Sequence, residues 1–160
     1  MNRSIVFLLI VGVILISGCA SQPQKIDTSK IEYKNILITV NRGAFNYDTF
    51  IVNQDGVIKY ELSENSKRYG NINQPGTTTV DPQEIKKLAK FIVEGSGFFD
   101  SNFQTVYPSR YKTDTSSLVI EVKIDDVEKK VGCDWCAINS EIEKKVIKLY
   151  GKEIKTFLPG

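Results

Sequence analysis

Histidine is absent from this chain of 160 residues. Its absence excludes the commonest general base, the Ser-His and Cys-His nucleophile pairs, and nearly every familiar zinc site. The Gly-rich loops that bind phosphates are also missing, and no Ser-x-x-Lys motif marks a nucleophilic serine. We therefore expect no catalytic residue, no metal site and no cofactor, and we predict that the protein is not an enzyme.

The chain has little net charge. Lys and Arg number 21 against 19 Asp and Glu, which leaves a formal charge of +2. A nucleic-acid binder held by electrostatics carries a larger basic excess, so we expect no nucleic-acid partner. Charged residues make up 25% and apolar residues 41%, a balance typical of a folded domain and wrong for a disordered chain.

Residues 1–18 are predicted to be a signal peptide. Arg3 supplies a positive charge ahead of an apolar run from Ile5 to Ile16. As a helix this run would be about 18 Å long, which is short of the ~30 Å hydrocarbon core of a membrane. That length favours a processed signal peptide over a permanent membrane span.

The motif Ile16-Ser17-Gly18-Cys19 resembles a lipobox, the pattern read by the lipoprotein-processing machinery of prokaryotes. The resemblance implies cleavage before Cys19 and a lipid on its sulfur. The protein would then be exported and lipid-anchored in the cell membrane or outer membrane, facing outside the cytoplasm. Ordinary secretory cleavage after Ala20 is the alternative, because Gly18-Cys19-Ala20 also has the small-x-small pattern.

Residues 19–32 are predicted to hold the lipid attachment site and a flexible tether. This segment is polar and has few apolar anchors. Eleven of its residues, fully extended, would reach about 35 Å. We expect a single domain over residues 33–155 to follow, and then a tail at 156–160.

The domain is predicted to be α+β. Two helices are expected to begin at Asp81-Pro82-Gln83-Glu84 and near Ser140, because both sites have capping-box patterns. Asp55-Gly56 predicts a hairpin turn, and polar residues 63–76 predict a loop. Alternating strand patterns cover Ile36 to Val40, Thr49 to Val52, Val57 to Leu62, Leu118 to Ile124 and Val127 to Val131. This order predicts an antiparallel sheet of about five strands with both helices packed on one face.

Several short motifs accompany these elements: an Asp-Gly-x-x-x-Tyr strand, a capped helix, a Phe-Phe pair and a Thr-Asp pair. The residues are Asp55, Gly56 and Tyr60, then Phe98 and Phe99, then Thr113 and Asp114. In this order the chain resembles a family of small exported prokaryotic proteins known only as a domain of unknown function. The resemblance covers roughly residues 33–152 and implies a fold but no activity.

Cys133 and Cys136 form a Cys-x-x-Cys motif, which can cycle between dithiol and disulfide. Two features argue against catalysis. Trp135 lies between the cysteines rather than before the first, and a helix beginning near Ser140 is too distant for its dipole to act on Cys133. Because an exported protein meets oxidising conditions, we predict a structural disulfide between the two cysteines, with thiol–disulfide exchange as the alternative function.

Aromatic and basic residues are interleaved over residues 97–112. We expect Phe98 and Phe99 to fill one end of the core, while the tyrosines that follow are partly exposed. The candidate binding surface comprises Tyr107, Arg110 and Tyr111.

Together these features predict a membrane-anchored envelope lipoprotein with a non-enzymatic binding or accessory role. The lipid on Cys19 would provide its contact with the membrane. The expected partner is another envelope protein or a cell-wall component, and the oligomeric state is left open.

Overall fold

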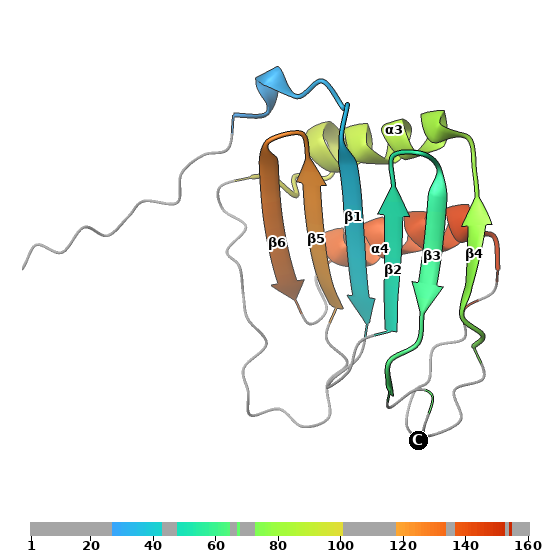
Figure 1. Ribbon diagram of the computed structural model, residues 1–160. Coiled ribbons are helices and arrows are strands. Elements are labelled where there is room, and N and C mark those ends of the chain that lie inside the picture. The colour runs from blue at the N-terminus through green and yellow to red at the C-terminus, as the bar shows by residue number, and fades with distance from the viewer. Residues whose placement is uncertain are drawn as a thin grey trace, which may run out of the picture.

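A computed structural model describes residues 27–42, 48–64, 67, 73–100, 118–133, 137–152 and 154. Within these residues, one antiparallel sheet has the strand order β4-β3-β2-β1-β5-β6 (Figure 1). The strands are β1 (Ile36–Arg42), β2 (Asp48–Asn53), β3 (Val57–Glu61), β4 (Gly76–Thr79), β5 (Leu118–Ile124) and β6 (Val127–Cys133). The α+β prediction is confirmed, and the predicted count of about five strands becomes six in the described chain.

Two α-helices accompany the sheet in the described part of the chain. α3 (Pro82–Lys90) continues into the π-helical turn η2 (Phe91–Gly95), and α4 (Ala137–Tyr150) follows β6. A short 3-10 turn, η1 (Thr28–Lys30), precedes β1. Figure 1 shows α3 and α4 crossing behind the same side of the sheet. No helix among the described residues is both long and apolar enough to cross a membrane.

The hydrophobic core lies between the sheet and these helices. In β1, Ile36, Ile38 and Val40 are at most 4% exposed, whereas the intervening Leu37 is 39% exposed. Alternate residues of a strand point to opposite faces, so β1 buries one face only. The helices contribute Ile85, Leu88, Ala89, Ile92, Ile142, Val146 and Tyr150 to the same core. Alternate residues of the strands and the residues on one face of each helix therefore form a single apolar layer.

The predicted Asp-Gly hairpin turn joins β2 to β3. The Gly56 amide donates to the Asn53 carbonyl at 3.1 Å, and Gly56 has φ +88°. The Gly56 carbonyl in turn accepts from the Val80 amide at 2.9 Å. A Cβ on Gly56 would overlap the Val80 carbonyl oxygen. Glycine is therefore required both for the backbone conformation and for the close approach of the chain that follows β4.

β4 is the strand that the sequence pattern did not reveal. It runs antiparallel to β3, with cross-strand partners from Val57 and Thr79 to Tyr60 and Gly76. Its sequence, Gly-Thr-Thr-Thr, has no apolar alternation because it lies at the edge of the sheet and buries no side chain. Pattern reading detects burial, so it misses such an edge strand.

α4 begins at Ala137, earlier than the start near Ser140 that the capping pattern predicted. Asn139 explains the difference, because it lies in the first turn and is fully buried. Its side-chain Nδ2 donates to the carbonyls of Leu118 and Val131 at 3.2 and 3.1 Å. These bonds hold the first turn of α4 against β5 and β6, a tertiary contact that Ser140 could not signal.

Candidate functional site

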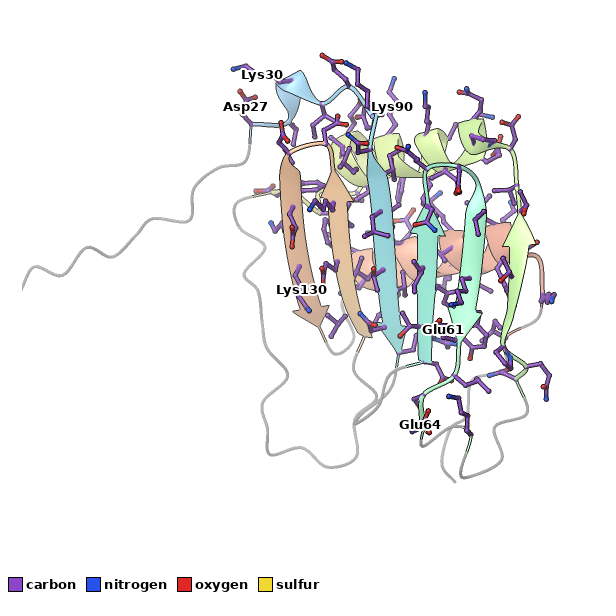
Figure 2. All side chains as sticks on the ribbon, in the orientation of Figure 1. Asp27, Lys30, Glu61, Glu64, Lys90 and Lys130 are labelled. Carbon is purple, nitrogen blue, oxygen red and sulfur yellow. The ribbon has the colours of Figure 1, made fainter. Side chains whose placement is uncertain are left out.

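The sheet has two dissimilar ends. At one, here called the turn end, tight turns join β2 to β3 and β5 to β6. At the other, the loop end, β1, β3 and β6 finish, and β2, β4 and β5 begin. Figure 2 shows Asp27, Lys30 and Lys90 at the turn end and Glu61 and Glu64 toward the loop end. Most longer connections of the chain therefore reach the sheet at the loop end.

The predicted site segments border the loop end. Cys133 is the last residue of β6, and its cross-strand partner is Leu118, the first residue of β5. Leu118 directly follows residues 101–117, and Cys133 directly precedes residues 134–136. Both predicted site segments are therefore connected to the sheet at this one residue pair. Cys19, Tyr107, Arg110, Tyr111, Cys136 and the side chain of Cys133 lie outside the described structure. The disulfide, the lipid site and the aromatic surface therefore stay predictions.

Phe98 and Phe99 have the structural role predicted for them. They are 0% and 5% exposed and belong to the main core. Their ring centroids are 5.4 Å apart with an interplanar angle of 77°, an edge-to-face arrangement. The prediction that this pair fills the core is confirmed.

A buried polar network ties β2 to β3 at the loop end. The Tyr60 hydroxyl donates to Asp48 Oδ2 at 3.0 Å, and the Ser63 amide donates to Asp48 Oδ1 at 2.8 Å. Asn73 also bonds the Tyr60 side chain. Burial, together with the Asp48 charge, raises the pKa of Tyr60, so its hydroxyl stays protonated beyond the pH at which an ordinary tyrosine ionises. Sequence reasoning missed this network because its members carry no shared spacing.

An ion pair connects β1 to α4. Arg42, at the end of β1, contacts Glu143 of α4, and each side chain is 17% exposed. The Arg42 charge also acts on Tyr60, where it opposes the rise in pKa. The loop end is thereby joined to the helix layer as well as along the sheet.

Three aromatic rings pack beneath this network. The centroid of Phe50 lies 4.6 Å from Tyr60 and 5.4 Å from Tyr150. The Tyr150 hydroxyl is buried with no hydrogen-bond partner in the described structure, and burial raises its pKa. It lies 2.9 Å from the position that a Cβ on Gly76 would occupy. Glycine at the start of β4 therefore makes room for this ring.

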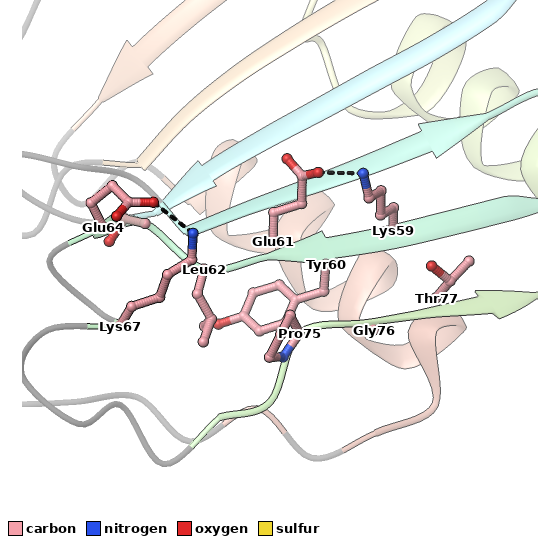
Figure 3. A pocket seen from close by; sticks show the side chains of 10 residues that line it. Lys59, Tyr60, Glu61, Leu62, Glu64, Lys67, Pro75, Gly76 and Thr77 are labelled. Atoms are coloured by element: carbon pink, nitrogen blue, oxygen red, sulfur yellow. Dashed lines mark hydrogen bonds and ion pairs between the residues drawn. The ribbon is translucent and has the colours of Figure 1, made fainter.

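A hollow of about 550 Å³ opens beside these residues, where β3 ends and β4 begins (Figure 3). The least polar part of its lining comes from Tyr60, Leu62, Pro75 and Gly76. Its size suits a small ligand or one side chain of a larger partner.

Two ion pairs lie along the edge of the hollow. Lys67 Nζ contacts Glu64 Oε1 at 2.6 Å, and Lys59 contacts Glu61 on β3 (Figure 3). These side chains are at least 45% exposed, so solvent weakens the pairs and a ligand could exchange with them. The hollow offers apolar contact and charges of both signs, which suits recognition.

The turn end is organised around one carboxylate. Asp125, in the turn between β5 and β6, accepts four backbone N–H bonds from residues 32–35. The donors are Glu32 at 2.8 Å and Tyr33, Lys34 and Asn35 at 2.9 Å each. Burial alone would raise the Asp125 pKa, but the four bonds outweigh it and the pKa is lowered. Only the Asp-Asp turn was visible in sequence, because the donors lie some ninety residues upstream.

Tyr33 adds a second attachment for the same segment. Its hydroxyl donates to Glu94 Oε1 of η2 at 3.0 Å. Burial, followed by the bond to Glu94, raises the pKa of Tyr33 to about 12. The chain entering β1 is therefore held both by the β5–β6 turn and by the end of the α3 helix.

Within the described part of the chain, no cluster of three or more cysteine, aspartate or glutamate side chains is placed to hold a metal ion. No protein-family model matches the sequence, and comparison with curated proteins gives no match.

Proposed function

We propose that this chain is a membrane-anchored envelope lipoprotein with a non-enzymatic binding or accessory role. Its α+β domain, with both helices packed on one face of the sheet, would be tethered through a lipid on Cys19. The partner would be another envelope protein or a cell-wall component. The order of Arg3, the apolar run and the Ile16-Ser17-Gly18-Cys19 motif supports the anchor.

The four-bond clamp at Asp125 is the observation that carries the proposal. It fixes residues 32–35, and hence the entry of the N-terminal chain, at the turn end. The predicted tether would therefore join the domain at the end of the sheet opposite the loop end. The hollow and the borders of both predicted site segments lie at the loop end.

Expression of the full chain in a bacterium supplied with an alkyne-labelled fatty acid tests the anchor. We expect label on Cys19, loss of residues 1–18 and recovery of the protein with membranes. The Cys19→Ser variant should carry no label and should leave the membrane fraction. Unlabelled wild-type protein beginning at Ser21 would contradict the proposal, because that product reports ordinary cleavage after Ala20.

One observation favours a second candidate, thiol–disulfide exchange by Cys133 and Cys136. α4 begins at Ala137, so Cys136 directly precedes the first helical residue. The prediction of a helix start near Ser140 was wrong. Cys133 still precedes Ala137 by four residues, so it is Cys136, and not Cys133, that the earlier start brings next to the helix. A helix N-terminus stabilises thiolate and lowers the pKa of a nearby cysteine.

A redox titration with thiol alkylation read by mass separates the two roles of the pair. A potential below about −300 mV, with thiols that react only after unfolding, indicates a structural disulfide. A potential of about −120 to −270 mV with one rapidly alkylated cysteine indicates exchange chemistry. In that case Cys133→Ser, which keeps Cys136 as the attacking thiol and removes the thiol that would resolve the mixed disulfide, should trap client proteins.

A further inference from the structure

The two edge strands of the sheet differ in how they are protected. β6 presents Glu128, Lys129 and Lys130 in succession, and Lys129 Nζ also donates to the Asp100 carbonyl at 2.7 Å. β4, at the opposite edge, has no charged residue (Figure 1). Charged side chains on an edge oppose the addition of another strand. β4 is therefore the less protected of the two edges.

The register shows which backbone groups of β4 face outward. The Val80 amide donates to the Gly56 carbonyl, so these two residues form a hydrogen-bonded pair. Because such pairs alternate in an antiparallel ladder, Thr78 directs its backbone groups toward β3, whereas Thr77 and Thr79 direct theirs outward. Among the described residues, no hydrogen bond reaches these outward groups.

The hollow continues this edge. Pro75, Gly76 and Thr77, which enter β4, form part of its lining (Figure 3). A strand added beside β4 would run past its mouth, and one of its side chains could enter. Edge and hollow together have the two parts of a strand-addition site: backbone groups for affinity and a pocket for selectivity.

A cation lies at the same end of β4. Lys152 Nζ is 3.1 Å from the position of a Cβ on Gly76, and the residue is exposed. Its described interaction is with the Tyr150 ring, 5.5 Å from Nζ to the centroid. No carboxylate in the described structure pairs with it. An acidic group of a partner strand lying along this end of β4 would come close to the Lys152 charge.

We propose that β4 binds an extended segment of a partner protein as an added strand. The backbone of the segment bonds to Thr77 and Thr79, one side chain enters the hollow, and an acidic side chain lies beside Lys152. This inference names the surface through which the proposed binding role is carried out.

A second copy of the chain fits this edge less well. Antiparallel pairing of two β4 strands would align edges of four residues each, far short of the ~1000 Å² expected of a specific interface. It would also reverse the second domain along the strand direction, so that the two N-terminal segments leave at opposite ends of the pair. This counts against a second copy when both copies are anchored in one membrane through Cys19, so the argument rests on the proposed anchor.

Peptide selection on the full chain, purified in detergent, provides the probe. We would select from a displayed library of random linear peptides about twelve residues long. Amide exchange would then be followed by NMR with the selected peptide added. We expect the amides of Thr77 and Thr79 to become protected only with peptide, while the Thr78 amide is protected throughout.

Substitutions on β4 separate strand addition from other binding. Thr77→Pro removes an outward N–H without removing a bond to β3, and should weaken the selected peptide at least about tenfold. Thr77→Val keeps that N–H and should weaken the peptide less than Thr77→Pro does. Lys152→Gln should weaken acidic peptides about two- to fivefold.

Three outcomes would overturn the inference. One is that selection yields no peptide preferring the wild type over Thr77→Pro. Another is that a bound peptide leaves Thr77 and Thr79 unprotected, a result that does not depend on Thr77→Pro folding. The third is protection that grows with protein concentration alone, which would assign the edge to a second copy. Because Cys19 is tested by lipid labelling, failure of the anchor and failure of this surface are distinguishable.

Discussion

The turn end and the loop end of the sheet each have an aspartate that accepts several hydrogen bonds, but the donors differ in kind. At the turn end, the Asp125 carboxylate gathers four backbone amides from one short segment. At the loop end, the Asp48 carboxylate accepts from the Tyr60 hydroxyl of β3 and from the backbone amide of Ser63, which follows β3 in the chain. All four donors to Asp125 are backbone amides, whereas one of the two described donors to Asp48, the Tyr60 hydroxyl, belongs to a side chain. Substitution of one donor residue, Tyr60, can therefore remove a bond at the loop end, whereas the bonds at the turn end are lost only when their acceptor Asp125 is replaced.

The largest expected effect is at the turn end, with Gly56→Ala. The new Cβ would overlap the Val80 carbonyl while φ stays positive, so we expect a loss of about 4 kcal/mol in the free energy of unfolding. Urea denaturation measures it. Gly97→Ala is the control, because Gly97 also has positive φ, but apart from its two chain neighbours no atom of the described residues lies within 4 Å of its Cβ position. That variant should lose only about 1 kcal/mol, and equal losses would refute the steric explanation.

Asp125→Ala should rank second. It leaves four amides without their acceptor, and because water can reach most of them we expect a loss of about 2–3 kcal/mol. Hydrogen exchange should also accelerate at residues 32–35. Asp125→Asn, which tolerates the positive φ and keeps one acceptor oxygen, should lose less. Asp126→Ala, one position along in the same turn, should change neither measurement.

At the loop end, a pair of tyrosines allows a matched comparison. Tyr60→Phe removes a donor from the buried Asp48 and should cost about 1–2 kcal/mol. Tyr150→Phe removes a hydroxyl with no described partner and should be neutral or slightly stabilising. Both rings pack against Phe50, so ring packing is preserved in each variant. Equal destabilisation of the two variants would show that the Asp48 bond contributes little.

The smallest effect is a pH dependence at the turn end. Because the folded state lowers the Asp125 pKa, its contribution to stability is complete above the unfolded value, near 3.9. That contribution is lost as pH falls through the lower folded pKa. Urea midpoints measured from pH 6 downward should fall less in Asp125→Asn than in the wild type. Parallel curves would mean that the carboxylate charge adds nothing.

Prediction from sequence succeeded where local pattern and burial coincide. The strands that bury one face were located by their alternation, and the Asp81 cap accepts from the Gln83 amide at 2.9 Å as its position indicated. Prediction failed at β4, whose threonines bury nothing, and at the start of α4, which Asn139 fixes through β5 and β6. The contact between Asp48 and Tyr60 in the candidate site was not predicted either, because the two residues meet only when β2 pairs with β3.

The sequence alone determined the α+β class, the turn at Asp55-Gly56 and the apolar faces of the helices, because each depends on neighbouring residues and on burial. Only the tertiary structure decided which edge of the sheet lacks charge, where the hollow opens and from which amides Asp125 accepts hydrogen bonds. Those features join residues far apart along the chain, and their positions depend on how six strands pair within the described sheet. A one-dimensional pattern carries no record of such pairing.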